Sequence, residues 1–204
     1  MNFRVYLISD RKLFDSEEEF LNTVEKALKA GVKAFQLREK DLTVRELYFL
    51  AKKMREITKR NDALLFINDR VDIALAVDAD GVHLPQNGFP AHIVKKTWKE
   101  KFFVGVSTHS LKEAEEVSEW ADFITFGPVF FTPSKAQYGQ PVGVENLKKV
   151  KEKVKCKVFA IGGIKPENLS QVLPYCDGVA LITGILSQKN IEEAVKKYLE
   201  ILGE

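Results

Sequence analysis

The chain has 204 residues, of which 45% are hydrophobic and 29% charged, so it suits one domain with a real core and not a disordered tail. Its net charge of +2, with Lys and Glu interspersed along the helical stretches, argues against nucleic-acid and anionic-membrane partners. There is no apolar run of membrane-spanning length, no signal peptide ahead of the first strand-like run and no CxxC motif, so we expect a reduced, cytoplasmic protein.

Short apolar segments alternate with longer amphipathic segments along the chain. The short ones are almost continuously apolar and rich in Val, Ile and Phe, which is typical of parallel strands buried on both faces. The expected strands are 3–9, 33–37, 63–67, 81–84, 102–106, 123–126, 157–161 and 178–182. Helices are expected between and after them, among others at 17–31, 43–60, 110–120, 143–154 and 190–202.

Eight strand–helix units in this length predict an α/β fold, a single (β/α)₈ TIM-barrel domain spanning 1–204. A recurring unit supports this prediction, since DADGVHL, WADFITF and YCDGVAL each place an Asp directly before a strand. An open doubly wound sheet would want GxGxxG after the first strand, and SDRKLF there contains no glycine. Ser110 with Glu113 predicts a capping box, and Gly31 a helix C-terminus.

The active site of such a barrel lies at the carboxyl ends of its strands. Glycines follow the seventh and eighth expected strands, and the residues concerned are Gly162, Gly163, Thr183 and Gly184. Backbone N–H groups in such turns can approach an anion closely, which predicts a phosphate site. The alternative is that the glycines only make tight strand-to-helix turns.

Charged residues follow the second and third strands. Arg38, Glu39 and Lys40 form either part of the barrel mouth or a self-paired surface cluster. Asp69 could ligate Mg²⁺, although one carboxylate makes a weak site. The alternative for Asn68 and Asp69 is a turn that caps the next helix.

Two further features concern the fifth and sixth strands. His109 could move a proton near neutral pH, or it could cap the next helix. Thr132, Ser134 and Lys135 offer two hydroxyls and a cation for a phosphate or diphosphate, and the polar stretch 132–141 could act as a lid. A solvated loop is the alternative. His83, within a strand, is interpreted as a core histidine.

Several stretches together resemble the thiamin phosphate synthase family and its TenI-type thiazole tautomerase branch. They are YLISD, QLREK, INDRVDIAL, ADGVHL, GVSTHS, GPVFFTPSK, AIGGI and GVALITGI, in this order. The resemblance implies a (β/α)₈ barrel. Synthases of the family join a hydroxymethylpyrimidine diphosphate to a thiazole phosphate with Mg²⁺ and release diphosphate. Its tautomerases aromatise a carboxylated thiazole phosphate without metal.

The resemblance also implies roles for individual residues. Those that match the pyrimidine-diphosphate site are Gln36, Arg38, Lys40 and Asn68, with Ser107 and Lys135 as diphosphate contacts and Asp69 as a Mg²⁺ ligand. Those that match the thiazole side are Thr132 and Ser134 in the loop and Gly163, Thr183 and Gly184 in the phosphate cradle. His109 matches the histidine proposed for proton transfer in tautomerases.

Departures from the synthase pattern favour the tautomerase branch. After the fourth strand the chain reads HLPQNGFP, with Gly88 where synthases carry a second Mg²⁺ carboxylate. TPSK followed by GQPVG also resembles tautomerases, whereas the intact QLREK and IND resemble synthases. We therefore expect a metal-free tautomerase in which His109 moves the proton and Arg38 or Lys40 holds the substrate carboxylate.

A Mg²⁺-dependent synthase is the first alternative, and a non-catalytic ligand sensor is the second. In each case the partner is a small phosphorylated molecule, with no nucleic acid and no membrane. A homodimer is possible, because this fold often pairs.

Overall fold

A computed structural model describes residues 2–132 and 140–203. Eight parallel strands close into a barrel in the order β1 to β8, with β1 paired to β2 on one side and to β8 on the other. The strands are β1 (Val5–Ile8), β2 (Ala34–Leu37), β3 (Leu64–Asn68), β4 (Gly81–Leu84), β5 (Phe103–Thr108), β6 (Phe123–Phe126), β7 (Lys157–Ile161) and β8 (Gly178–Leu181). The predicted (β/α)₈ barrel is confirmed.

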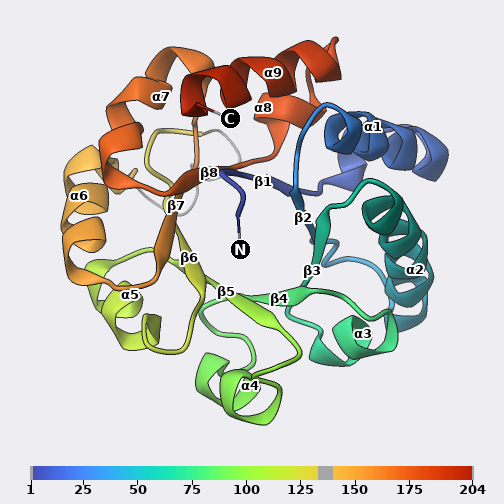
Figure 1. Ribbon diagram of the computed structural model, residues 1–204, viewed down its shortest axis with the longest axis horizontal. Coiled ribbons are helices and arrows are strands. Elements are labelled where there is room, and N and C mark those ends of the chain that lie inside the picture. The colour runs from blue at the N-terminus through green and yellow to red at the C-terminus, as the bar shows by residue number, and fades with distance from the viewer. Residues whose placement is uncertain (1, 133–139, 204) are drawn as a thin grey trace.

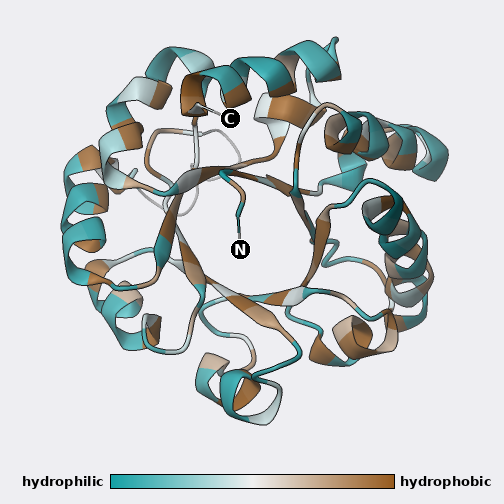
Figure 2. Ribbon diagram, in the orientation of Figure 1, coloured by the Kyte–Doolittle hydropathy of each residue, from teal (hydrophilic) through white to brown (hydrophobic). Residues whose placement is uncertain are grey.

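Helices form a ring outside the strands, as Figure 1 shows. They are α1 (Glu17–Lys29), α2 (Val44–Arg60), α3 (Val71–Ala76), α4 (Ala91–Thr97), α5 (Leu111–Val117), α6 (Gly143–Lys153), α7 (Pro166–Val172), α8 (Thr183–Leu186) and α9 (Ile191–Leu202). Two 3₁₀ turns, η1 (Arg11–Leu13) and η3 (Leu173–Tyr175), complete the described elements. Figure 2 shows the apolar faces of the helices turned towards the strands and the polar faces turned outwards, because each helix covers one face of the barrel.

Helix ends follow the local sequence in most places. Thr43 and Glu46 form a full capping box at the start of α2, and Gly31 follows α1 with a φ of +123°. The capping box predicted at α5 is only half present. Ser110 Oγ accepts from Glu113 N at 3.3 Å, but the Glu113 carboxylate accepts from His109 N at 2.7 Å instead of closing on Ser110.

A hydrophobic cluster, mostly of aromatic side chains, fills the amino-terminal part of the barrel interior. Its members are Phe3, Tyr6, Ile8, Ala34, Phe66, Phe123, Phe159 and Ala180. Phe3 is 4% exposed and packs against Tyr6, Phe66, Phe123 and Phe159, so it closes the amino-terminal end of the barrel. This end is therefore packed solid, and any ligand must approach from the carboxyl ends of the strands.

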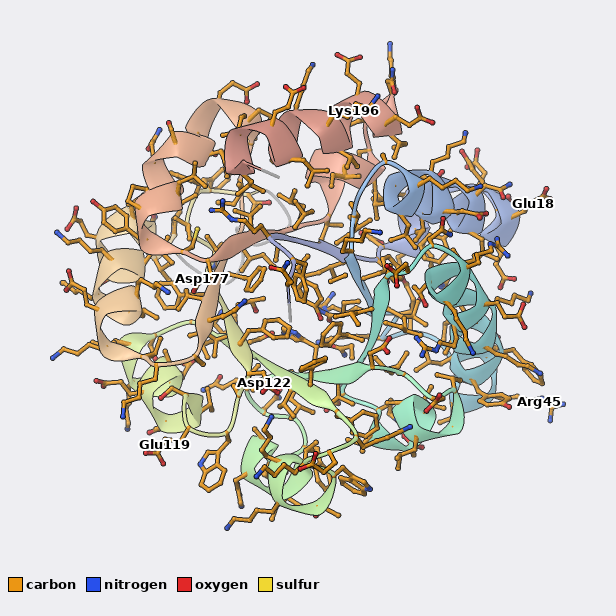
Figure 3. All side chains as sticks on the ribbon, in the orientation of Figure 1. Glu18, Arg45, Glu119, Asp122, Asp177 and Lys196 are labelled. Carbon is orange, nitrogen blue, oxygen red and sulfur yellow. The ribbon has the colours of Figure 1, made fainter. Side chains whose placement is uncertain are left out.

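The recurring Asp before a strand has a structural role. Asp122 accepts from Val104 N of the preceding strand at 2.7 Å and pairs with Lys95 of α4 at 2.6 Å. Asp80 makes the same two contacts with β3 and Arg55, and Asp177 with β7 and Lys151. Figure 3 labels Asp122 and Asp177 beside the strands, whereas Glu18, Arg45, Glu119 and Lys196 lie at the periphery. Each Asp thus ties a helix to two strands.

Asp122→Ala is expected to lower the free energy of unfolding by about 3 kcal/mol, because it leaves a buried backbone N–H without an acceptor and breaks a half-buried ion pair. For a chain of this size that corresponds to a fall in Tm of roughly 6–12 °C in a thermal melt. Asp78→Asn is the matched control, since the Asp78 carboxylate is largely exposed and pairs with Lys101, and Asn accepts the left-handed backbone at this position (φ +54°) as Asp does. Equal losses of Tm in the two variants would contradict the role of Asp122 in joining a helix to two strands.

Candidate active site

The predicted site residues that the structure describes lie at the carboxyl ends of six strands. Gln36, Arg38 and Lys40 lie in or after β2, Asn68 and Asp69 end β3, and Ser107 and His109 end β5. Thr132 follows β6, Gly162 and Gly163 follow β7, and Thr183 and Gly184 begin α8 after β8. Because all eight strands are parallel, these ends share one mouth.

A chain of hydrogen bonds crosses the barrel interior below the mouth. Gln36 Nε2 donates to Tyr6 Oη at 3.2 Å, Tyr6 Oη lies 3.3 Å from His83 Nδ1, and His83 Nε2 lies 3.0 Å from Ser107 Oγ. Burial lowers the pKa of His83 to about 3, so its ring is neutral, and burial raises the pKa of Tyr6 well above its usual value. His83 is therefore a satisfied core histidine, as predicted, but it also reaches a predicted site residue.

Glu39 does not join a surface cluster. It is 6% exposed and accepts from Ser9 Oγ at 2.6 Å and from Arg11 N at 3.0 Å, while Ser9 Oγ accepts from Arg38 N at 2.8 Å. Burial raises the pKa of the Glu39 carboxyl. The self-paired surface interpretation is wrong for this residue, because Glu39 is buried, links the end of β1 to the end of β2 and, through Ser9, holds the backbone of Arg38.

Lys40 lies within range of the charges of Arg38 and Asp69. Partial desolvation and the Arg38 guanidinium lower the pKa of Lys40, whereas the Asp69 carboxylate raises it. Arg38 also contributes to the lowered pKa of His83. Two cations and one carboxylate therefore act on one another at the ends of β2 and β3, and this side of the mouth can attract an anion.

Asp69 is the acidic residue expected to bind Mg²⁺. Its backbone has a φ of +62°, and its Oδ1 accepts from Phe89 N at 3.3 Å. A Cβ added to Gly88 would overlap Asp69 Oδ1 and come within 2.7 Å of Pro85 Cδ. There is therefore no room for a side chain at position 88 in this loop conformation. A second carboxylate could enter here only if the loop moved.

The donor set fits Mg²⁺ carried on a substrate diphosphate and not an all-protein site. Within residues 2–132 and 140–203 there is no group of three or more His, Cys, Asp or Glu side chains placed to hold a metal. Mg²⁺ is commonly bound through one or two carboxylates, several waters and substrate phosphates. Asp69 can supply the one carboxylate that such a site requires.

His109 is exposed but oriented. Its Nδ1 lies 2.8 Å from Gly127 O, and a carbonyl only accepts, so Nδ1 carries the hydrogen. In the neutral ring this leaves Nε2 as an acceptor of protons. The helix-cap alternative is half right, because it is the His109 backbone N–H, and not the ring, that meets the start of α5.

The turn after β7 is built around two glycines in the left-handed region. Gly162 has a φ of +96° and Gly163 a φ of +66°. A Cβ at 162 would come within 2.5 Å of Pro128 Cα, and one at 163 within 2.7 Å of Phe131 O. The segment after β6 packs on this turn, with Phe130 N donating to Gly162 O at 3.0 Å. The tight-turn interpretation is correct for both glycines, and it leaves the phosphate prediction open.

Thr183 is exposed at the start of α8, and Gly184 lies beside a buried tyrosine. A Cβ at 184 would come within 2.6 Å of Tyr198 Oη, which donates to Ile164 O at 3.1 Å. Thr132 is half-buried at the end of the segment after β6. Ser134 and Lys135, and with them most of the predicted lid 132–141, lie outside the described residues.

Sequence reasoning missed Tyr6, Ser9 and Arg11. Their signal was present in part, since alternation along β1 turns Tyr6 and Ile8 inwards. Nothing in the local sequence indicated that Ser9 and Arg11 would donate hydrogen bonds to the carboxylate of Glu39, which follows a different strand.

The fold and this mouth define a (β/α)₈ barrel with an anion-attracting side and a glycine-turn side. The family described as "Thiamine monophosphate synthase" matches residues 5–185. A protein of Aquifex aeolicus named "Putative thiamine-phosphate synthase 2" is 51% identical over 89% of this chain and 95% of its own length. The "Thiamine-phosphate synthase" of Archaeoglobus fulgidus is 39% identical over 97% of this chain and 92% of its own.

A solved structure is also similar. The "Thiamine phosphate pyrophosphorylase" of Pyrococcus furiosus superposes with a TM-score of 0.88 at 37% identity, covering 98% of this chain and 96% of that one. The chain belongs to the thiamin monophosphate synthase family. Among the described residues no helix has the length and apolarity needed to cross a bilayer.

The comparisons bear on the two branches. The relatives and the solved structure carry synthase names, which supports the synthase alternative better than the expected tautomerase. The family itself, predicted from the motifs, is confirmed.

Proposed function

We propose that this chain is a thiamin-phosphate synthase, which joins a hydroxymethylpyrimidine diphosphate to a thiazole phosphate and releases diphosphate. The observation that carries the proposal is the presence of two separate anion-suited regions in one mouth. One is the cationic side formed by Arg38 and Lys40 opposite Asp69, and the other is the glycine turn at 162–163. The synthase names of the relatives support it.

The reaction breaks the bond between the pyrimidine methylene carbon and a diphosphate oxygen, and the thiazole nitrogen forms a new bond to that carbon. Negative charge collects on the leaving diphosphate while positive charge remains on the pyrimidine. Arg38 and Lys40 would hold the diphosphate through charge-assisted hydrogen bonds, and Ser107 would add a hydroxyl donor. Fixed charges of this kind act in the transition state without reorganisation, which is the main source of rate enhancement here.

Mg²⁺ on the diphosphate would neutralise part of the leaving charge, and Asp69 would hold it. The glycine turn and the start of α8 would place the thiazole phosphate, with Gly162, Gly163, Thr183 and Gly184 presenting backbone N–H groups. Gln36 and Asn68 would contact the pyrimidine. Thr132, Ser134 and Lys135 would complete the thiazole and diphosphate contacts.

The test is product formation from the pyrimidine diphosphate and aromatic thiazole phosphate, with and without Mg²⁺. Thiamin phosphate that forms only with Mg²⁺ is the expected result. Absence of product under both conditions, together with conversion of the non-aromatic thiazole tautomer without metal, would overturn the proposal in favour of the tautomerase.

Asp69→Asn is expected to raise the Mg²⁺ concentration for half-maximal activity on the order of tenfold or more, because the neutral amide loses the charge attraction to the metal. Calorimetric titration of inorganic diphosphate in the presence of Mg²⁺ should show the same loss without relying on turnover.

Asp72→Asn is the control. Asp72 lies three residues further on, is mostly exposed and pairs with Arg70 at the start of α3. It should leave the Mg²⁺ dependence unchanged. An unchanged Mg²⁺ dependence in Asp69→Asn would show that the metal is held elsewhere.

The tautomerase is a second candidate, because one specific observation favours it. His109 is fixed through Nδ1 and presents Nε2 as a base at the mouth. An oriented imidazole nitrogen that can accept a proton suits the proton transfer that aromatises a thiazole ring. Gly88 is consistent with this candidate, since a metal-free reaction needs no second carboxylate.

Two properties of the molecule remain predictions. We propose a cytoplasmic location, and a homodimer whose existence sedimentation analysis can establish. Neither changes the chemistry argued for the mouth.

A further inference from the structure

The buried chain from Gln36 to Ser107 connects two regions that the proposed reaction uses separately. Its inner members are Tyr6, which is 0% exposed, and His83, which is 2% exposed. A Cβ at Gly105 would come within 2.6 Å of His83 Nδ1, so the absence of a side chain at 105 makes room for the ring. The two inner residues are enclosed by the barrel, and water has no access to exchange hydrogen bonds with them.

Each inner member has one hydrogen to share. The Tyr6 hydroxyl carries one, and the neutral His83 ring carries one on either Nδ1 or Nε2. If Tyr6 donates to Nδ1, the hydrogen must sit on Nε2 and point at Ser107 Oγ. If Nδ1 carries it, Tyr6 must accept there and donate towards Gln36. The three hydrogen bonds therefore all run in one of two directions. In the first direction each donor lies on the Gln36 side of its acceptor, and in the second direction each donor lies on the Ser107 side.

The two directions present opposite chemistry at the ends. In the first, Ser107 Oγ accepts from His83, so its own hydroxyl is free to donate to a ligand, and the Gln36 amide donates to Tyr6. In the second, Ser107 donates inwards and offers only an acceptor, and Gln36 must turn its carbonyl to Tyr6. An anion requires a donor, so a diphosphate at Ser107 selects the first direction.

One buried atom bears on the other end. Gln36 Oε1 is buried and has no hydrogen-bond partner among the described residues. A buried acceptor left unpaired costs about 1–3 kcal/mol, so a ligand donor that reaches it gains that stabilisation. The first direction keeps this acceptor available, and the second direction removes it.

We propose that Tyr6 and His83 are positioning residues that couple the two ends of the pyrimidine-diphosphate site. Diphosphate oxygens at Ser107 fix the direction of the chain, and that direction keeps Gln36 Oε1 as an acceptor for an amino group on the heterocycle. Binding of either end then favours binding of the other, although neither inner residue touches the ligand. This inference rests on the proposed synthase function.

The coupling is measured with two probes, inorganic diphosphate with Mg²⁺ and a 4-aminopyrimidine that lacks the diphosphate arm. In the unmodified protein, diphosphate should tighten aminopyrimidine binding about fivefold or more, and the reverse effect should be equal. Tyr6→Phe keeps the ring and removes the hydroxyl, so each probe should still bind while the ratio of affinities falls to about one. Ser107→Ala should abolish the coupling as well, because it removes the end of the chain that the diphosphate orders.

Thr58→Val is the matched control. Thr58 has a fully buried hydroxyl that donates to Arg55 O inside α2, away from the mouth. It should cost stability as Tyr6→Phe does and keep the coupling. Coupling that persists in Tyr6→Phe, or that disappears equally in Thr58→Val, would overturn the proposal.

Nitrogen NMR of the ring gives a second readout that does not depend on turnover. The chain has three histidines, which makes assignment direct. With diphosphate bound, His83 should be the Nε2–H tautomer, and an Nδ1–H tautomer would overturn the proposal. If the protein forms thiamin phosphate but the two probes bind independently, only the coupling proposal is wrong. If the probes are coupled but no thiamin phosphate forms, only the proposed synthase function is wrong. If neither probe binds, both are wrong.

Discussion

Gly162→Ala is expected to raise the KM for thiazole phosphate on the order of a hundredfold and to lower the free energy of unfolding by about 3 kcal/mol. The added Cβ would meet Pro128 Cα at 2.5 Å, in a backbone whose φ is +96°. The turn must then move away from the segment after β6, and the N–H groups that we propose bind the phosphate move with it. Steady-state kinetics with each substrate varied and urea unfolding measure the two effects.

Gly143→Ala separates strain from crowding. Gly143 has a φ of +77°, but an added Cβ meets nothing within 4 Å. It should therefore show only the cost of a left-handed L-residue, about 1–2 kcal/mol, with the KM unchanged. If Gly162→Ala behaved like Gly143→Ala, the turn after β7 would be a structural feature without a part in phosphate binding.

His109→Ala is expected to separate the two candidate reactions. A tautomerase that loses its proton carrier should slow by on the order of a hundredfold or more, with little change in affinity for the thiazole phosphate. Condensation of the two phosphorylated substrates should fall far less, because diphosphate departure is assisted by charge and needs no base at His109. Both rates are measured on the same preparation of the variant.

The control for His109→Ala is Glu113→Gln. Glu113 accepts from His109 N at 2.7 Å, so the amide keeps an acceptor there and the ring in place. Glu113→Gln should preserve whichever reaction the protein catalyses. A condensation rate that falls as steeply as isomerisation in His109→Ala would make His109 part of the synthase chemistry too.

The fold was predictable because its cause is local and repeated. Each strand is a short, continuously apolar run, and parallel strands buried on both faces require that pattern wherever they occur. The expected first strand, 3–9, is longer than β1, because Phe3 turns into the barrel to close its end and Ser9 turns out to Glu39. Strand ends depend on such partners, and partners are not visible in a segment read alone.

The position of the predicted site residues at the strand ends could be read from the sequence, whereas their contacts could not. The rule that strand ends form the mouth selected Arg38, Lys40, Asp69, Ser107 and His109 before any contact was known. The two branches, however, share those residues, so motifs alone favoured the tautomerase while the named relatives support the synthase. Of the two departures that favoured the tautomerase, the one at Gly88 leaves Asp69 as the carboxylate proposed to hold Mg²⁺.

The sequence by itself determined the barrel, its family and the strand ends where we propose that the chemistry takes place, because the spacing of apolar residues and the order of motifs are properties of short segments. Only the tertiary structure decided that Glu39 is a buried brace, that the backbone at Gly88 fills the space beside Asp69, and that His83 joins Gln36 to Ser107. These depend on which side chains meet across strands far apart in the chain. Closure of the barrel brings them within hydrogen-bonding distance, and no local pattern encodes that distance.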